Sequence, residues 1–306
     1  DGADGAVDET TADGQPVATG ETRRALTRAE RRWLLAICLV AAAARLGWWL
    51  YAHVEPPSSE VLGGDPWMYW LLGNDIAHGR WYTNHVTGEP SAYYPVGFPA
   101  VLGGLYWVGN HVPFVDVDNM ALTGMFQIVI STATVALTFV VGRRLAGPRA
   151  GLVAAAVLAV FPNLIFQVTT IQIETTFIFF TMAALAIIVD HDWSTGPPSV
   201  RRLVAFGAVL AACGLVRPFS LPVLLGVFLA VLATGWGWRR AVAVTAVPIA
   251  VIVLAFVPWT VRNWVVMDAF VPSANNMSDM LSLDRPDETT GQFRWAPHDG
   301  CADPDL

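Results

Sequence analysis

Residues 63–99 read GGDPWMYWLLGNDIAHGRWYTNHVTGEPSAYYPVGFP, the longest polar and aromatic interval between otherwise apolar blocks. They include the acids Asp65, Asp75 and Glu89 and many Trp and Tyr side chains. In the whole chain of 306 residues, 54% are hydrophobic and only 14% are charged, against about 25% charged residues in a soluble domain. Because the excess apolar residues come in blocks, the sequence predicts an all-α polytopic membrane protein whose helices hold this stretch at one membrane face.

The arginines indicate how these helices cross the membrane. The chain has 18 basic residues, all of them arginine, and basic residues are enriched in cytoplasmic loops. Twelve of them cluster beside apolar blocks: Arg23, Arg24, Arg28, Arg31, Arg32, Arg143, Arg144, Arg149, Arg201, Arg202, Arg239 and Arg240. One alternating path from a cytoplasmic N-terminus places all of these on the inner side. It predicts a bundle of about seven spans, at residues 33–52, 120–141, 150–168, 175–189, 203–216, 219–233 and 241–259.

This path divides the chain into three parts. Residues 1–32 are predicted to be a disordered cytoplasmic tail that ends in the first basic flank. Residues 33–259 form the transmembrane module, with a large outer loop at 53–119. Residues 260–306 form an outer polar segment, which we expect to be the start of a longer region.

Two segments of the outer loop are predicted to be amphipathic helices lying along the membrane surface. The first, at 66–78, begins at Asp65, with this aspartate as N-cap and proline in the first turn. The second, at 95–109, is as apolar as a span but is only about 15 residues long, where a span needs about 20. If it did cross the membrane, the arginines at 143–149 would fall outside.

Asp65 is the first candidate for chemistry. The neighbouring Trp67, Tyr69 and Trp70 would partly desolvate a carboxylate at the membrane surface, as suits a general base. The alternative is that Asp65 only caps the following helix, and the two roles are compatible.

Three further candidates fall at the same predicted face. Glu174 begins the span at 175–189, and an acid at a membrane boundary is costly unless it faces a polar cavity, where it can bind a sugar hydroxyl, a cation or an acceptor. Arg217 and Arg262 lie outside, against the positive-inside bias, and guanidinium groups bind phosphate with two parallel hydrogen bonds. The alternatives are an interfacial cap for the acid and snorkelling for the arginines. Arg45, inside the first span, is predicted to snorkel outward.

No metal motif is visible in the sequence. The spacing of His78 and His85 with the nearby acids fits no zinc site. A divalent cation between Asp65 and Glu174 is the one metal hypothesis left open, so no cofactor is predicted with certainty. The net charge of −7 comes largely from the tails and outer loops and does not indicate a nucleic-acid partner.

Several short motifs follow one another in a recognisable order. The outer loop contains Gly64-Asp65-x-x-x-Tyr69, NDIAHGRWY at 74–82 and YPVGFP at 94–99. Later come GRRLAG at 142–147, Ile173-Glu174, LVRP at 215–218 and PWTVRN at 258–263. Over residues 33–295 this series resembles membrane glycosyltransferases of the GT-C class. It is most similar to glycosyltransferase family 39, the bacterial relatives of protein mannosyltransferases and of lipid A aminoarabinose transferases.

The resemblance implies an inverting glycosyltransferase in the bacterial plasma membrane. Its donor would be a polyprenyl-phosphate sugar, and its acceptor a hydroxyl of a glycan, lipid or protein on the outer face. The resemblance implies Asp65 as catalytic base. The predicted donor-binding side chains are Glu174, Arg217, Arg262, Tyr69 and Tyr94.

Two departures from the family pattern stand out. Many relatives carry a lysine or a double proline where this chain has YYPV at 93–96, which puts one phosphate contact in doubt. The segment after Asn275 lacks the usual run rich in Gly and Asn.

A non-catalytic protein that binds or flips a lipid-linked sugar is the alternative function. Ion-coupled transport is disfavoured because the acids lie in outer loops and not in mid-membrane.

Overall fold

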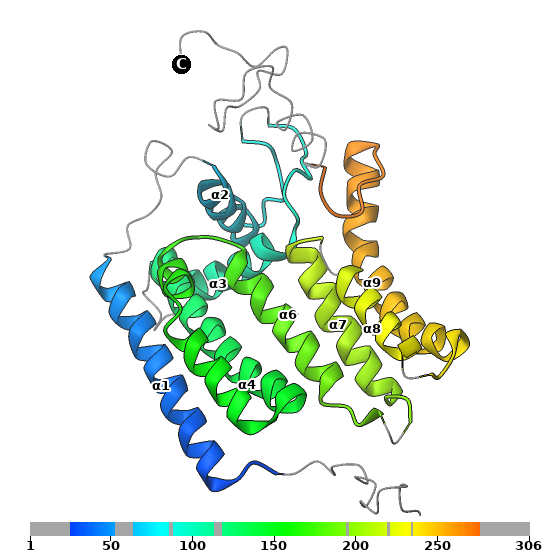
Figure 1. Cartoon of the computed structure of the whole chain (residues 1–306). Coiled ribbons are helices and arrows are strands. Elements are labelled where there is room, and N and C mark those ends of the chain that lie inside the picture. The colour runs from blue at the N-terminus through cyan, green and yellow to red at the C-terminus, as the bar shows by residue number, and fades with distance from the viewer. Residues whose placement is uncertain are drawn as a thin grey trace, which may run out of the picture.

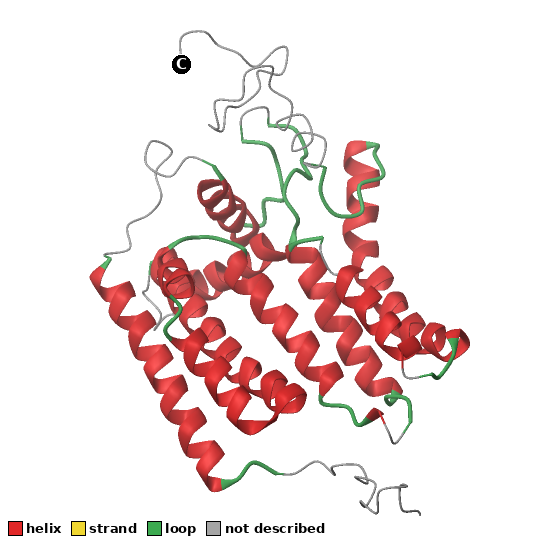
Figure 2. Ribbon diagram, in the orientation of Figure 1, coloured by secondary structure: helices red, strands yellow, loops and turns green. Residues whose placement is uncertain are grey.

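The computed structural model describes residues 25–52, 64–85, 88–112, 118–193, 196–218, 221–233 and 235–275. Throughout these ranges the regular elements are helices, apart from an isolated bridge between Thr83 and Pro90. Figure 2 shows this all-helical composition, which confirms the predicted fold class. Of the predicted tail at 1–32, residues 1–24 lie outside the described residues, as does most of the predicted outer segment, 276–306. The basic flank of that tail, from Arg28, belongs to the first helix.

The helices pack side by side as a bundle (Figure 1). In chain order they are α1 (Arg28–Tyr51), α2 (Asp65–Ala77), α3 (Gly97–His111), α4 (Asn119–Ala159), α5 (Pro162–Phe166), the 3-10 turn η1 (Gln167–Thr169), α6 (Glu174–Val189), α7 (Val200–Val216), α8 (Leu221–Ala233) and α9 (Trp238–Met267). Of these, α1, α4 and α9 are long and apolar enough to cross a membrane. Because α6 and α8 are apolar but shorter, the count of seven spans stays a prediction.

The helix α4 is two helices joined at a reversal. Gly147 takes φ 87°, which L side chains rarely adopt, and the direction of the chain changes there. The two halves then approach closely, because a Cβ added to Gly142 would lie 2.9 Å from the Cα of Gly151. They correspond to the spans predicted at 120–141 and 150–168.

Two helix ends differ most from the predicted ones. The second half of α4 ends at Ala159 and not at residue 168, because Pro162 lacks the amide hydrogen that would continue the helix. The chain then forms α5 and η1 before α6. The last helix, α9, was predicted to end at residue 259 but continues as far as Met267.

The arginine clusters that the structure describes gather at one end of the bundle, the lower end in Figure 1. Side chains there link successive helices: Arg143 to Glu30, Arg144 to the carbonyl of Val189, Arg202 to the carbonyl of Ile187, and the ring of Trp193 to that of Trp236. The alternating path proposed from the sequence requires these clusters to share one end. The start of α2, the start of α6 and the end of α7 lie at the opposite, upper end.

Arg45 does not snorkel as predicted, because its side chain is fully buried between α1 and both halves of α4. Its Nε donates to Ser131 Oγ at 2.7 Å, and its Nη1 donates to the carbonyl of Ala159 at 2.8 Å. The third guanidinium nitrogen, Nη2, donates to the carbonyl of Leu158 at 3.4 Å. The last carbonyls of a helix have no partner within that helix. Arg45 therefore caps the second half of α4 from a neighbouring helix.

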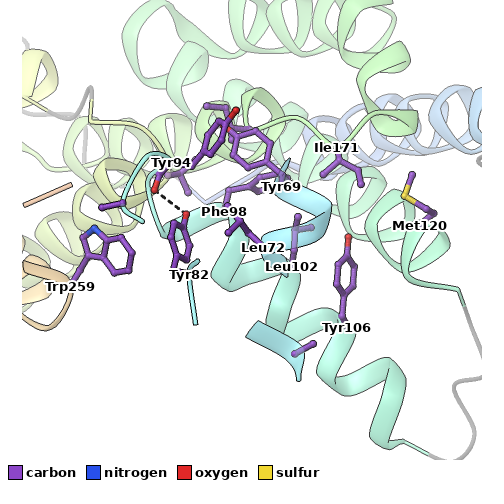
Figure 3. Close-up of a cluster of buried hydrophobic side chains, with 14 residues drawn as sticks. Tyr69, Leu72, Tyr82, Tyr94, Phe98, Leu102, Tyr106, Met120, Ile171 and Trp259 are labelled. Carbon is purple, nitrogen blue, oxygen red and sulfur yellow. Dashed lines mark hydrogen bonds between the residues drawn. The ribbon is translucent and has the colours of Figure 1, made fainter. Parts of the chain in front are cut away.

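A buried aromatic cluster holds the upper end together (Figure 3). It draws side chains from α2, α3, α4, α7 and α9, and from the segment at 78–96 between α2 and α3, called here the α2–α3 loop. Its largest members are Tyr69, Leu72, Tyr82, Tyr94, Phe98, Leu102, Tyr106, Met120, Ile171 and Trp259. Because these come from segments far apart in the chain, their packing determines how the loop sits on the bundle.

Candidate functional site

The sequence suggested that Asp65 is the N-cap of α2. In the structure Asp65 is instead the first residue of this helix. Gly64 occupies the cap position, and no side chain caps the helix. The carboxylate is therefore available for another partner: its Oδ1 accepts a hydrogen bond from the hydroxyl of Tyr94 at 2.8 Å. Asp65 is exposed, and the positive end of the helix dipole favours its negative charge. The result is an exposed carboxylate with one of its oxygens held in place.

Two buried tyrosines lie beneath this carboxylate. The rings of Tyr69 and Tyr94 pack edge to face with centroids 5.0 Å apart, and Phe98 packs on Tyr69 at 5.2 Å. Burial raises the pKa of the Tyr94 phenol, and the negative charge of Asp65 raises it further. At neutral pH Tyr94 is therefore a hydrogen-bond donor to the carboxylate.

Tyr69 lies among all the charges of the site. Burial is the main cause that raises the pKa of its phenol, and the charges of Asp65 and Glu174 add to this effect. Arg217 acts in the opposite direction. Charges from three separate elements, α2, α6 and the end of α7, therefore act on this one phenol.

Glu174 and Arg217 form an open ion pair. Glu174 begins α6 and Arg217 follows the last residue of α7, with 3.5 Å between Oε1 and Nη1. Their side chains are 36% and 44% exposed, and an exposed pair contributes only about 0–1 kcal/mol. The second carboxylate oxygen, Oε2, is buried without a hydrogen-bond partner among the described residues. The pair therefore has unused capacity for a polar ligand.

Gly97 lets the start of α3 rest directly on the last turn of α7. A Cβ added at this position would lie 2.5 Å from the carbonyl carbon of Leu215 and 2.6 Å from the nitrogen of Val216. Real Cβ atoms do not approach backbone atoms so closely. This contact joins the segment that carries Tyr94 to the segment that carries Arg217.

We therefore expect Gly97→Ala to displace the end of α7 and to destabilise the protein by about 1–3 kcal/mol, as overpacking does. The melting temperature in detergent measures this loss. Gly104→Ala is the matched control in the same helix, because a Cβ there meets nothing within 4 Å and alanine favours helix. Equal melting temperatures for Gly97→Ala and the wild-type protein would show that the close contact is wrong.

The buried phenols also predict a pH dependence. Burial raises the pKa values of Tyr69, Tyr82, Tyr94 and Tyr106 in the folded protein above the value of about 10 found in unfolded chains. Their neutral forms thus contribute stability below about pH 10 that is lost as the pH rises further. An absorbance titration should show no more than two of the six tyrosines ionising near pH 10 before the protein unfolds. Ionisation of three or more in the folded state would contradict this.

Arg262 lies near the end of α9. Its guanidinium faces the α2–α3 loop, where Nη2 donates to the carbonyl of Tyr82 at 2.9 Å and Nη1 to that of Ser91 at 2.8 Å. The structure thus groups Asp65, Tyr69, Tyr94, Glu174 and Arg217, while Arg262 binds the loop that carries one of them. Its predicted contact with the donor stays a prediction.

Asp75 and His85, prominent in the sequence, hold the first half of the same loop. Asp75 is buried, and its two oxygens pair with Arg80 Nε at 3.1 Å and His85 Nε2 at 2.8 Å. Sequence reasoning did not single out Tyr82 or Gly97, although both shape the site. Tyr82 was one aromatic residue among many, and only the packed structure shows which ring is buried.

The carboxylates of the site are poor candidates for binding a divalent cation. Across the described ranges, no three His, Cys, Asp or Glu side chains are placed to hold a metal ion. Asp65 and Glu174 reach the same site, but Asp65 Oδ1 accepts from Tyr94 and Glu174 Oε1 pairs with Arg217. Divalent Ca²⁺ and Mg²⁺ need about six oxygen ligands, and a neighbouring guanidinium opposes them. Asp65 and Glu174 therefore fit a divalent cation poorly.

Comparison with known proteins places the fold. No protein-family model and no curated protein matches the chain. The archaeal oligosaccharyltransferase AglB from Archaeoglobus fulgidus, in complex with an inhibitory peptide and a dolichol-phosphate, aligns with a TM-score of 0.58 at 16% identity over 76% of this chain. The Archaeoglobus fulgidus oligosaccharyltransferase in the apo form gives 0.56 at 16% identity over 77%.

These alignments show the fold alone, because the identity is low. The same archaeal enzyme tethered with an acceptor peptide containing the NVT sequon gives a TM-score of 0.57 at 17% identity. The chain spans 30% of the length of each of these three proteins. It therefore has a GT-C-type membrane fold, as the sequence predicted, whereas membership of family 39 stays a prediction.

Proposed function

We propose that this chain is the transmembrane catalytic module of a glycosyltransferase that moves a sugar from a polyprenyl-phosphate donor to an acceptor hydroxyl. One observation carries the proposal: at the bundle end opposite the arginine clusters, Tyr94 holds Asp65, Arg217 pairs with Glu174, and the charges of all three ionic residues act on the Tyr69 phenol. A fixed carboxylate beside an exposed guanidinium suits a reaction that removes a proton and releases a phosphate. The fold supports the proposal, since the similar structures are oligosaccharyltransferases.

The proposed reaction is a single displacement. Asp65 takes the proton of the acceptor hydroxyl while its oxygen attacks the anomeric carbon. The new carbon–oxygen bond forms as the bond from that carbon to the phosphate oxygen breaks. The electron pair leaves with polyprenyl phosphate, and the configuration at the anomeric carbon inverts. Because Tyr94 occupies Oδ1 of the carboxylate, Oδ2 is the oxygen that receives the proton.

The other side chains of the site bind the donor in this proposal. Arg217 stabilises the negative charge that grows on the departing phosphate. Glu174 Oε2, which has no partner among the described residues, accepts a hydrogen bond from a sugar hydroxyl. Tyr69, kept protonated by burial, can donate a hydrogen bond to the sugar in this proposal.

The proposed orientation follows from the arginines. Their end of the bundle faces the cytoplasm of a bacterial cell, so the N-terminus is inside and the segment after α9 is outside. The site then lies at the outer membrane surface. A polyprenyl chain stays in the bilayer and its phosphate stays at the surface, so this end of the bundle is where donor and acceptor can meet.

A transfer assay tests the proposal. The purified protein in lipid nanodiscs receives a synthetic polyprenyl-phosphate sugar and candidate glycan, lipid and peptide acceptors, and the release of free polyprenyl phosphate is followed. We expect release that depends on the acceptor and on Asp65. The non-catalytic alternative predicts that the donor is retained, as mass spectrometry detects, with no release. Mass spectrometry of a co-purified lipid would also name the sugar.

A further inference from the structure

We propose that Arg262 is a positioning residue that holds the α2–α3 loop on α9 and, through Tyr82, keeps Tyr94 on Asp65. It acts in this way without contacting the donor. This inference rests on the proposed function for the role of Asp65. It also replaces phosphate binding as the explanation for an arginine at this end of the bundle.

The guanidinium of Arg262 is surrounded by acceptors from the protein itself. Besides the carbonyls of Tyr82 and Ser91, Nη1 donates to Asn263 Oδ1 at 3.0 Å. Its central carbon lies 5.2 Å from the ring centre of Trp259, in cation–π contact. Without Arg262 the carbonyl of Ser91 would lose this donor, and a buried carbonyl without a donor costs about 1–3 kcal/mol. The carbonyl of Tyr82 would keep only its bond from the amide of Ser91. A phosphate that bound Nη1 would have to displace the acceptors of that nitrogen.

Tyr82 carries the effect from Arg262 toward the site. Its side chain is 1% exposed, and its ring packs edge to face on Trp259 with centroids 4.9 Å apart. Its hydroxyl donates to the carbonyls of Tyr94 at 2.9 Å and of Pro95 at 3.0 Å, the first of which is the dashed line in Figure 3. Arg262 thus binds the main chain of Tyr82, while the Tyr82 side chain binds the main chain of Tyr94.

These contacts hold the backbone of Tyr82 in an unfavourable conformation. Its φ of 42° lies in the left-handed region, which bulky residues rarely adopt. Such a conformation costs of order 1–3 kcal/mol and persists only where surrounding contacts over-determine it. The Arg262 bond to its carbonyl is one of these contacts. Without that bond we expect the loop to relax.

Each half of the α2–α3 loop is held by a different helix. Asp75 of α2 holds the first half through Arg80 and His85. The half that leads to Tyr94 is held by Arg262 of α9, and the turn after α9 adds a bond from the amide of Asn275 to the carbonyl of Ala92 at 3.0 Å. Tyr94 then reaches Asp65 at 2.8 Å. Arg262 is therefore connected to the proposed base by consecutive hydrogen bonds.

Hydrogen exchange and kinetics together test this inference. In Arg262→Gln we expect the amide of Ser91, which bonds to the carbonyl of Tyr82 at 2.9 Å, to exchange at least about tenfold faster. We expect kcat to fall about 10- to 100-fold, because a small misplacement of a reacting group has effects of this size, with KM for the donor within twofold. Arg262→Lys should be equally impaired, since one ammonium cannot reproduce the planar fork.

Two further variants complete the design. Arg239→Gln is the matched control: it removes an arginine from the same helix that also stacks on a tryptophan, Trp238, at 5.6 Å, but at the opposite end. We expect it to leave exchange and kcat unchanged. Tyr82→Phe keeps Arg262 and removes only the hydroxyl, so it should lower kcat like Arg262→Gln even if the latter folds poorly, and the two effects should not add.

The outcomes separate this inference from the proposed function. A raised KM for the donor with unchanged Ser91 exchange, and partial recovery in Arg262→Lys, would show that Arg262 binds phosphate and would overturn the inference. Normal kcat in Tyr82→Phe would also overturn it. The exchange measurement needs no turnover. If the wild-type protein transfers no sugar, the proposed function fails, while exchange at Ser91 still decides whether Arg262 holds the loop.

Discussion

Asp65→Asn is expected to lower the rate constant of sugar transfer by about 10²- to 10⁴-fold, the usual contribution of a general base. Asparagine keeps the size of the side chain and an oxygen that can accept the hydrogen bond from Tyr94, which is 2.8 Å long in the native protein. It cannot take a proton from the acceptor. The effect should therefore fall on kcat, with little change in KM for the donor or in melting temperature. Release of polyprenyl phosphate under saturating donor measures it.

A matched control separates the base from the charge. Asp268→Asn makes the same change just after α9, where Asp268 takes φ 50°, a left-handed conformation that asparagine tolerates. We expect normal transfer by this variant. Near-normal transfer by Asp65→Asn would remove Asp65 from the mechanism. A loss of activity accompanied by a clear fall in melting temperature would instead assign Asp65 a structural role.

The order of the helices could be predicted from the sequence because it depends on one-dimensional patterns. Apolar blocks and arginine clusters repeat along the chain, and the positions of α1, α6 and α7 follow from them to within a few residues. The same alternation predicted that Asp65, Glu174 and Arg217 share one face. Charged residues at the ends of apolar helices lie at the membrane surface, because burying them in the hydrocarbon core is costly.

The sequence did not predict the contacts that depend on packing. Arg45 was expected to snorkel because a lone arginine in a span usually does, but free carbonyls at the end of α4 and the hydroxyl of Ser131 satisfy it inside the bundle. These partners are 86 or more residues away along the chain. For Arg262 the acceptors are carbonyls of the α2–α3 loop, and main-chain oxygens leave no trace in a sequence motif.

Arg217→Ala is expected to lower kcat/KM for the donor by about 10²- to 10³-fold, the typical cost of removing a group that stabilises developing negative charge. Among the described residues, the guanidinium contacts Glu174 in an exposed pair at 3.5 Å and stacks on Phe177 at 5.8 Å. Since such a pair contributes about 0–1 kcal/mol, the variant should fold and melt like the wild-type protein. Its loss should therefore appear in the kinetics and not in stability.

The division between kcat and KM shows when Arg217 acts. If it binds the phosphate equally before and during reaction, only KM rises; if it binds the growing charge more tightly, kcat falls as well. We expect a fall in kcat, and an intermediate fall for Arg217→Lys, because an ammonium keeps the charge but loses the two parallel bonds. Arg239→Ala, at the other end of the bundle, supplies the control for the lost charge. An unchanged dependence of the rate on donor concentration in Arg217→Ala would show that this arginine is structural, and the leaving phosphate would then need another partner.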